Sequence, residues 1–160
     1  MDKVRVGIAE YRLAEAPTVL VARGLGSCIA VMLHDASGQR GGLAHVLLPA
    51  PREGHTHVKP ATYVTTAIEA MVRELEAAGS KRSELIAKLV GGSQMFAASH
   101  EQIEPIGTRN LAQALEVLAQ FNIPIAAQET GGSHGRSLEF NLENGEVAVS
   151  TVRTAQPMLL

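Results

Sequence analysis

Apolar residues in the first third of the chain follow the pattern of β-strands. Over residues 4–8 they alternate with more polar residues, which is the period of a strand with one buried face. Residues 18–21 form a short, mostly β-branched run that predicts a second strand. Two more apolar runs, at 29–33 and 43–48, are separated by turn-forming residues. We expect these two runs to pair as a β-hairpin.

Helical spacing of apolar residues occurs twice in the rest of the chain. Over residues 61–78 the apolar positions recur three and four apart, and Gly79 stands where a glycine ends many helices. Thr108 is placed to cap a second helix, which ends before Asn122 and Pro124. The expected apolar face of this second helix carries Leu111, Leu115 and Leu118. The pattern therefore predicts two main amphipathic helices.

Further strands are expected between and after these helices. Residues 85–90 and 123–127 are compact apolar runs. Lys88 interrupts the first of them and predicts that its strand has an accessible edge. Asn144-Gly145 is a strong two-residue hairpin signal, which predicts two opposed apolar pairs, Leu142 with Val147 and Phe140 with Val149.

The order of these elements predicts the fold class. Strands come first and are followed by helices mixed with strands, which favours an α+β fold over a doubly wound parallel one. We expect a mixed α/β sandwich with largely antiparallel or mixed sheets. The 160 residues contain no repeat or linker, so residues 1–160 are expected to form a single domain.

Charge and composition exclude several classes of partner. The 14 Lys and Arg residues are balanced by 16 Asp and Glu residues, so the chain lacks the basic excess of a nucleic-acid-binding protein. No apolar run approaches membrane-spanning length, and the first residues lack the features of a secretory signal. We expect a cytoplasmic protein that neither inserts into a membrane nor binds nucleic acid.

The sole cysteine, Cys28, follows a glycine-bracketed turn in the sequence GLGSCIAV. It cannot form an internal disulfide, and a free cysteine is most often a small buried hydrophobic residue. A second interpretation, as a nucleophile, comes from the predicted hairpin. If Leu33 pairs with Arg40, then Cys28 lies directly opposite His45, with Cβ atoms roughly 4.5–5.5 Å apart.

The surroundings of Cys28 carry the groups that nucleophilic catalysis needs. Backbone N–H groups at Cys28 and in the preceding turn, at Gly26 and Ser27, are expected to stabilise an oxyanion. The Ser27 hydroxyl either adds to them or stabilises the turn. These groups and His45 would lower the pKa of the thiol. His45 lies in an apolar run, so the alternative is a core histidine whose hydrogen bonds are satisfied.

Other polar motifs predict neither a metal nor a cofactor. His55-Thr56-His57 could present two imidazoles on one face, but no third zinc ligand is evident, and we interpret them as loop histidines. The glycine loops at 91–93 and 131–136 could bind anions through N–H groups, yet they lack the lysine spacing of a P-loop. We expect both to shape loops.

Several motifs, in order along nearly the whole chain, resemble the CheD family of chemoreceptor glutamine deamidases. Their sequences are GLGSCIAVMLHD, GGLAHVLLP, KLVGGSQMF, IGTRNLAQAL and NIPIAAQETGGSHGR, followed by the terminal hairpin. The resemblance implies a cysteine hydrolase that converts particular glutamines of methyl-accepting chemotaxis receptors to glutamate, without a cofactor. It places the family's nucleophile on Cys28 and its base on His45, and implies a fold similar to that of bacterial toxin deamidases.

The chain departs from the family pattern next to the expected site. The family's usual third catalytic residue, a threonine, is matched by Ala22, and a leucine is matched by Arg23. A backbone carbonyl or another residue must then orient His45, and Thr18 is near in sequence. His134 stands where the family usually has an aromatic residue, and the resemblance places the two glycine loops around the substrate cleft.

Two other functions compete with deamidation. In a transglutaminase, an amine rather than water would resolve the same thioester. A regulatory binding module would pair with a receptor or with a CheC-type phosphatase, which the resemblance implies as a partner, and Ala22 would suit such a role.

Overall fold

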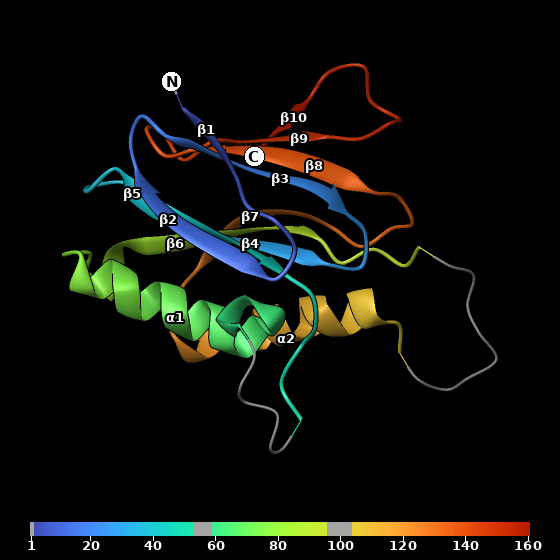
Figure 1. The fold of residues 1–160 in the computed structure, drawn as a ribbon, viewed down its shortest axis with the longest axis horizontal. Coiled ribbons are helices and arrows are strands. Elements are labelled where there is room, and N and C mark those ends of the chain that lie inside the picture. The colour runs from blue at the N-terminus through green and yellow to red at the C-terminus, as the bar shows by residue number, and fades with distance from the viewer. Residues whose placement is uncertain (1, 53–58, 96–103) are drawn as a thin grey trace.

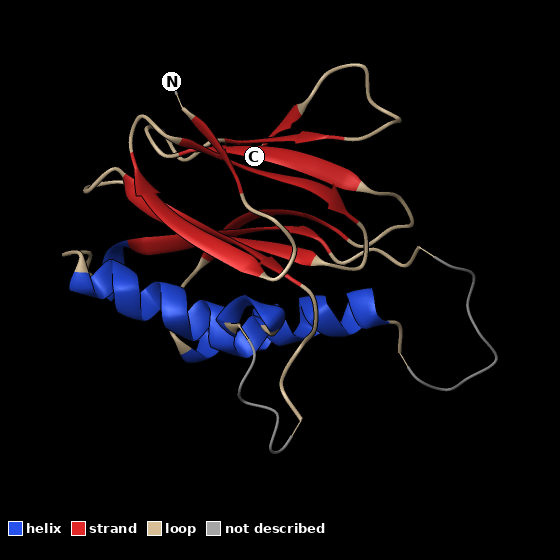
Figure 2. Cartoon of the chain, viewed as in Figure 1, coloured by secondary structure: helices blue, strands red, loops and turns tan. Residues whose placement is uncertain are grey.

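The computed structural model describes residues 2–52, 59–95 and 104–160. Over these residues the chain forms two five-stranded sheets packed face to face, with two α-helices on the outer face of one sheet (Figure 1). The three layers, sheet, sheet and helices, are clear when helices and strands are coloured separately (Figure 2). The α+β sandwich expected from the sequence is confirmed.

Both sheets are mixed. The first has the order β1-β3-β8-β9-β10, with bounds Lys3–Arg5, Val19–Leu25, Arg136–Asn141, Val147–Ser150 and Met158–Leu159. The second has the order β2-β5-β4-β6-β7, with bounds Glu10–Glu15, Arg40–Val46, Ile29–Asp35, Leu85–Gly91 and Ile125–Thr130. The pairs β1–β3 and β6–β7 are parallel, and the other neighbours are antiparallel.

The β4–β5 hairpin has a register that differs from the prediction by two residues. Asp35 pairs with Arg40, so Ala30, and not Cys28, lies opposite His45. The loop is shorter than expected because the strand continues through His34 and Asp35, whose carboxylate accepts hydrogen bonds from the turn and from Ser80. A shift of two residues keeps the same face, so Cys28 and His45 still point into the same layer.

The β8–β9 hairpin deviates in the same way. Phe140 pairs with Val147 and Leu138 with Val149, so the predicted pairs are wrong by two residues although the apolar face is right. The connection is wider than a two-residue turn, because the Asn141 N–H donates to the Glu146 carbonyl and the Gly145 N–H to the Asn141 carbonyl.

The helices α1 (Val64–Ala77) and α2 (Ile106–Gln120) cover the second sheet. One core lies between the helices and this sheet, and another lies between the two sheets. Two predictions for α2 are wrong. The helix begins at Ile106 after Pro105, whose ring fixes φ at a value suited to a helix start, so Thr108 lies inside the first turn and does not cap it. Of the predicted apolar face, Leu118 is fully buried and Leu111 packs against the core, but Leu115 is 39% exposed.

Two features of the second sheet were not expected. The edge strand β2 has a polar sequence, EYRLAE, whose inner face is only half-buried, and its pattern predicts no strand. Lys88 does not mark an accessible edge, since β6 lies between β4 and β7. Its ammonium group donates instead to the carbonyls of Gly145 and Leu160, at 2.9 and 2.7 Å. Among the helices in the described ranges, none is long and apolar enough to cross a membrane.

Candidate active site

Cys28 lies in a tight turn between the two sheets. The turn follows Leu25, the last residue of β3 in the first sheet, and enters β4 of the second sheet at Ile29. Gly24, near the end of β3, has a φ of 67°, which suits glycine. The Cys28 side chain is 7% exposed and packs in the inter-sheet core with Ala22 and Ala30. The thiol is thus part of the core and still borders the surface.

Three consecutive carbonyls of this turn are held by neighbouring segments. The Gly26 carbonyl accepts a hydrogen bond from the Ser93 N–H, and the Cys28 carbonyl accepts one from the Gly92 N–H, both at 2.9 Å. Between them, the Ser27 carbonyl accepts a hydrogen bond from Asn110 Nδ2, also at 2.9 Å. The carbonyl side of the turn is therefore held by hydrogen bonds. Within the described residues, the N–H groups of Ser27 and Cys28 donate to no backbone carbonyl.

His45 is held from the first sheet by a backbone carbonyl. Its side chain is 1% exposed, and Nδ1 lies 3.3 Å from the carbonyl oxygen of Val6. A carbonyl only accepts hydrogen bonds, so Nδ1 carries the proton and Nε2 of the neutral ring has a free lone pair. Nε2 is buried and has no hydrogen-bond partner among the described residues. It is available to accept a proton.

Cys28 and His45 are diagonal neighbours across the β4–β5 hairpin. Ala30 pairs with His45, and Cys28 lies two residues before Ala30 on the same face. Diagonal neighbours are typically about 7–8 Å apart, with their Cβ atoms somewhat closer, which is within reach of long side chains. In the described part of the chain, no hydrogen bond joins Nε2 to the thiol. The structure therefore places a thiol and an unprotonated imidazole nitrogen in one layer.

Burial favours the neutral forms of both groups. It raises the pKa of Cys28 above 9.0, although the thiol's own backbone N–H partly opposes this. It lowers the pKa of His45 below 6.5, although the hydrogen bond to Val6 partly opposes this. The expectation that the turn and His45 lower the pKa of the thiol is therefore wrong, because desolvation dominates. The resting pair is a thiol and a neutral imidazole.

Ala22 and Thr18 lie at different distances along β3 from the Cys28 turn. Ala22 is fully buried in the same core as Cys28, so its position fits a site residue, but it has no side-chain acceptor. Thr18 precedes the opposite end of β3, where its carbonyl accepts a hydrogen bond from the Leu142 N–H. The structure brings Ala22 to the site and not Thr18, and Val6 supplies the acceptor for His45.

Restoring the family's threonine is not expected to raise activity. In Ala22→Thr, the new hydroxyl would compete for a ring nitrogen that already donates to Val6, and the extra atoms would enter a packed core. We expect a kcat/KM within about threefold of the wild-type value and a free energy of unfolding lower by about 1–3 kcal/mol. Steady-state kinetics and urea titration measure these quantities. A tenfold gain in activity would show that Val6 does not orient His45 adequately.

The two glycine loops close around the turn, as expected of loops with a shaping role. Ser93 is fully buried, and its hydroxyl donates to the carbonyls of Gly131 and His134, at 3.1 and 2.8 Å. The buried Arg136 donates to the Ser93 hydroxyl, to the Gly131 carbonyl and to Glu129. This network joins the loops to Gly92 and Ser93, which hold the Cys28 turn. His134 takes part through its backbone.

Exposed apolar side chains lie on the segments that flank Cys28 and His45. Ile8 is 56% exposed and precedes Ala9, whose N–H donates to the His45 carbonyl. Leu47 is 37% exposed and follows His45 by two residues. Met95 is 45% exposed and contacts Gly26, where an added Cβ would lie 3.1 Å from Met95 Cγ. They give the segments next to Cys28 and His45 an apolar surface.

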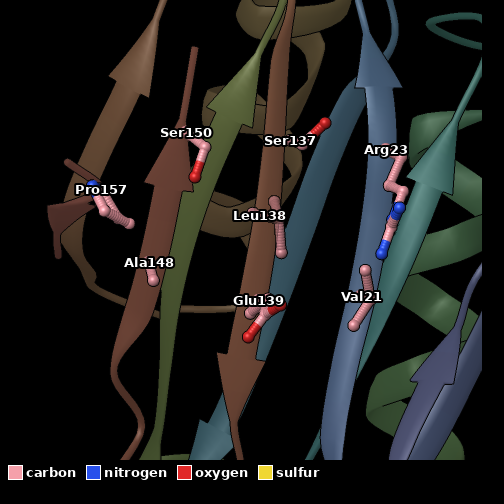
Figure 3. Close-up of a pocket in the computed structure, with 8 residues that line it drawn as sticks. All are labelled: Val21, Arg23, Ser137, Leu138, Glu139, Ala148, Ser150 and Pro157. Carbon is pink, nitrogen blue, oxygen red and sulfur yellow. The ribbon is translucent and has the colours of Figure 1, made fainter. Parts of the chain in front are cut away.

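A separate hollow lies on the outer face of the first sheet. Its volume is about 310 Å³, and it is lined by Val21, Arg23, Ser137, Leu138, Glu139, Ala148, Ser150 and Pro157 (Figure 3). Figure 3 shows these residues on neighbouring strands, with Arg23 and Glu139 among them. The lining of the hollow does not include Cys28, which lies in the turn between the sheets, or His45, which lies on β5 of the second sheet. Arg23, which replaces the family's leucine, lines this outer face.

Metal ligands are not clustered in the part of the chain that the structure describes, where no three His, Cys, Asp or Glu side chains are grouped to hold an ion. His55 and His57 lie outside the described residues. Gly26 and Ser27 lie in the turn itself, and Ser27 is half-buried.

Comparison with known proteins supports the family resemblance that the motifs indicated. The model of the family described as "CheD chemotactic sensory transduction" matches residues 47–151. The chain belongs to the CheD family. It is 46% identical to "Probable chemoreceptor glutamine deamidase CheD 3" of Geobacter sulfurreducens, over 96% of this chain and 94% of that protein. It is 38% identical to "Chemoreceptor glutamine deamidase CheD" of Halalkalibacterium halodurans, over 97% of each.

The two comparisons cover different parts of the site. The region matched by the CheD family model begins after Cys28 and His45 and includes Ser93, Asn110 and Arg136, which hold the turn. The similarity to the Geobacter and Halalkalibacterium proteins extends over nearly the whole chain and so spans the hairpin as well.

Asn110 is the site residue that sequence reasoning missed. It lies on α2, its side chain is fully buried, and it donates to both the Ser27 and Leu47 carbonyls. The signal was present in the sequence, since Asn110 falls on the buried face of the helix between Gly107 and Ala114. A polar residue inside an apolar stripe usually has a specific partner.

Proposed function

We propose that this CheD protein is a cysteine-dependent glutamine deamidase of chemoreceptors. Its relatives are named chemoreceptor glutamine deamidases and match it over nearly its full length. The observation that carries the mechanism is the free Nε2 lone pair of His45, on the same hairpin face as Cys28. A base with a free lone pair, on the same hairpin face as a thiol, is the arrangement from which general-base activation of a nucleophile can start.

The first half of the reaction forms a thioester. His45 Nε2 takes the proton of the Cys28 thiol while the sulfur attacks the carboxamide carbon of the substrate glutamine. The negative charge moves to the carboxamide oxygen, where the N–H groups of Ser27 and Cys28 stabilise it. The carbon–nitrogen bond then breaks, and protonated His45 gives its proton to the leaving ammonia.

The second half restores the enzyme. His45 takes a proton from water, and the oxygen attacks the thioester carbon. The carbon–sulfur bond breaks, the sulfur recovers its proton from His45, and glutamate leaves. The chain's own groups supply every proton transfer, so the proposal includes neither a metal nor a cofactor. We place this activity in one CheD-like domain over residues 1–160, in the cytoplasm.

The buried thiol favours glutamine as the side chain that enters. Cys28 is 7% exposed, so the substrate backbone stays outside while a long, unbranched side chain reaches the sulfur. The exposed side chains on the segments next to Cys28 and His45 include Ile8, Leu47 and Met95. They are apolar and carry no charge that would select a carboxylate or an ammonium group. A neutral carboxamide fits these surroundings.

The proposal is tested with a purified chemoreceptor cytoplasmic fragment from the same organism. Incubation with the wild-type protein is expected to release ammonia and to convert particular receptor glutamines to glutamate, as seen by peptide mass spectrometry. Added primary amine distinguishes the transglutaminase alternative, because that activity would incorporate the amine. A folded wild-type protein that converts no glutamine would contradict the proposal.

A CheC-type phosphatase is the second partner that we propose, from the resemblance alone. Titration of a CheC protein from the same organism with this chain, followed by calorimetry, tests the pairing. Binding by a Cys28→Ala variant that has lost deamidation would separate the regulatory role from catalysis.

The pH dependence follows from the two pKa shifts. His45 acts as a base only when neutral, so kcat/KM is expected to fall on the acid side with an apparent pKa below 6.5. Iodoacetamide alkylation of Cys28 in the free enzyme is expected to rise with an apparent pKa above 9.0. Rapid alkylation that persists at acidic pH would instead indicate a thiolate–imidazolium pair and contradict the neutral resting state.

A further inference from the structure

The amide group of Asn110 touches the backbone on both sides of the site. Nδ2 donates to the Ser27 carbonyl at 2.9 Å and to the Leu47 carbonyl at 3.1 Å. Ser27 directly precedes Cys28, and Leu47 follows His45 by two residues. Through these two hydrogen bonds, one side chain of α2 connects the Cys28 turn to the segment that follows β5.

The contact with Ser27 determines where the Cys28 N–H points. The Ser27 carbonyl and the Cys28 N–H belong to the same trans peptide group and point in opposite directions. Since the carbonyl is held toward α2, the N–H is directed away from the helix. The backbone N–H of Cys28 also opposes the rise in the pKa of the thiol that burial causes, which fits an N–H near the sulfur. This is where the proposed mechanism needs an oxyanion donor.

Two further observations separate Asn110 from an ordinary core residue. Its side chain is fully buried, yet Oδ1 has no hydrogen-bond partner among the described residues. An unpaired buried oxygen destabilises a fold, and an apolar residue would avoid that cost. The two carbonyl contacts fix the amide orientation, because a flipped amide would set Oδ1 against both carbonyls.

The start of α2 is packed closely enough to hold this geometry. An added Cβ on Gly107 would lie 2.2 Å from the Ser93 carbonyl oxygen and 2.8 Å from the Gly92 carbonyl carbon. Gly92 and Ser93 are the residues whose N–H groups hold the Cys28 and Gly26 carbonyls. Asn110, one helical turn after Gly107, thus projects from a rigid support onto the middle carbonyl of the turn.

We infer that Asn110 is a positioning residue for the deamidation reaction, which aims the Cys28 N–H at the oxyanion. The inference rests on the proposed function for its catalytic consequence. Its geometric part, that Asn110 orients the Ser27–Cys28 peptide group, stands independently of activity. Asn110 does not touch the reacting atoms and acts through this peptide group.

The test uses Asn110→Leu, which keeps a side chain of similar size in the core and removes both hydrogen bonds. We expect kcat for receptor glutamine to fall by about 10- to 100-fold with KM changed by less than about twofold, because oxyanion stabilisation acts on the transition state. The amide resonance of Cys28 in an ¹⁵N-correlation spectrum is expected to move, because the Ser27 carbonyl loses its donor. Thermal unfolding is recorded for each variant.

Val117→Ala serves as the matched control, because Val117 is buried on the same helix two turns after Asn110, in the core between the helices and the second sheet, whereas Cys28 packs in the inter-sheet core. It is expected to lower the unfolding temperature and to leave kcat and the Cys28 amide resonance unchanged. An Asn110→Leu protein with wild-type kcat, or with an unmoved Cys28 resonance, would overturn the inference. If the wild-type protein itself converts no glutamine, the proposed function fails, and a moved Cys28 resonance still supports the positioning role.

Discussion

Replacement of Cys28 by serine is expected to lower the rate of glutamine conversion by at least about a thousandfold, since the loss of a nucleophile removes the covalent route. A hydroxyl is far less acidic than a thiol, and the buried surroundings that already raise the pKa of Cys28 disfavour an alkoxide further. Mass spectrometry of a receptor fragment, with initial rates from ammonia release, measures the effect. KM is not expected to explain the loss.

Cys28→Ala is the companion variant, because serine adds a buried hydroxyl to the inter-sheet core. Alanine removes the sulfur without adding a polar atom, so any loss of stability comes from lost packing, with a cost of about 1 kcal/mol. Both variants are checked by thermal unfolding. Deamidation by a folded Cys28→Ala protein at more than a few per cent of the wild-type rate would show that the nucleophile lies elsewhere.

The faces of the sheets could be predicted from the sequence, whereas the registers could not. Both hairpin predictions are wrong by two residues, since Asp35 pairs with Arg40 and Phe140 with Val147. Turn residues such as Gly38 and Gly145 mark where a chain reverses but leave the loop length open. Alternation has a period of two, so an error of two leaves every side chain on its predicted face.

The candidate pair could be found from the sequence because its two members are side chains in one hairpin. The group that orients His45 could not, because it is the backbone carbonyl of Val6, and any residue supplies a carbonyl. The sequence also could not predict that the pKa of Cys28 is raised. This rise depends on burial between two sheets, and only the packing of distant strands determines that burial.

The buried position of Asn110 could not be predicted from the sequence either. Helical spacing identified α2 but assigned its apolar face to leucines, and Leu115 is in fact partly exposed. The buried face contains small residues, because α2 approaches the backbone of Gly92 and Ser93 closely. The first part of α2 packs through Gly107 and Ala114, with Val117 and Leu118 following, so its apolar signal near Asn110 is weak and a polar residue there is easily assigned to the solvent side.

Replacement of His45 is expected to have the second large effect, a fall in kcat of about 100- to 10,000-fold, the usual contribution of a general base. His45→Asn is the informative change. Its amide nitrogen takes the approximate place of Nδ1 and retains a donor toward the Val6 carbonyl, but the side chain cannot accept a proton. The remaining activity is expected to lose the acid limb, because the group with the lowered pKa is gone.

His34 provides the matched control on the same hairpin. It is 5% exposed, faces the inter-sheet core, contacts the Phe140 ring, and its Nε2 lies 3.2 Å from the Leu142 carbonyl oxygen. In His34→Gln the amide nitrogen can keep that contact, so the variant loses a buried imidazole far from the thiol. We expect it to lose stability and to keep a kcat within about threefold of wild type, since His34 serves packing. Comparable kcat losses in His34→Gln and His45→Asn would mean that His45, like His34, affects activity only by stabilising the fold.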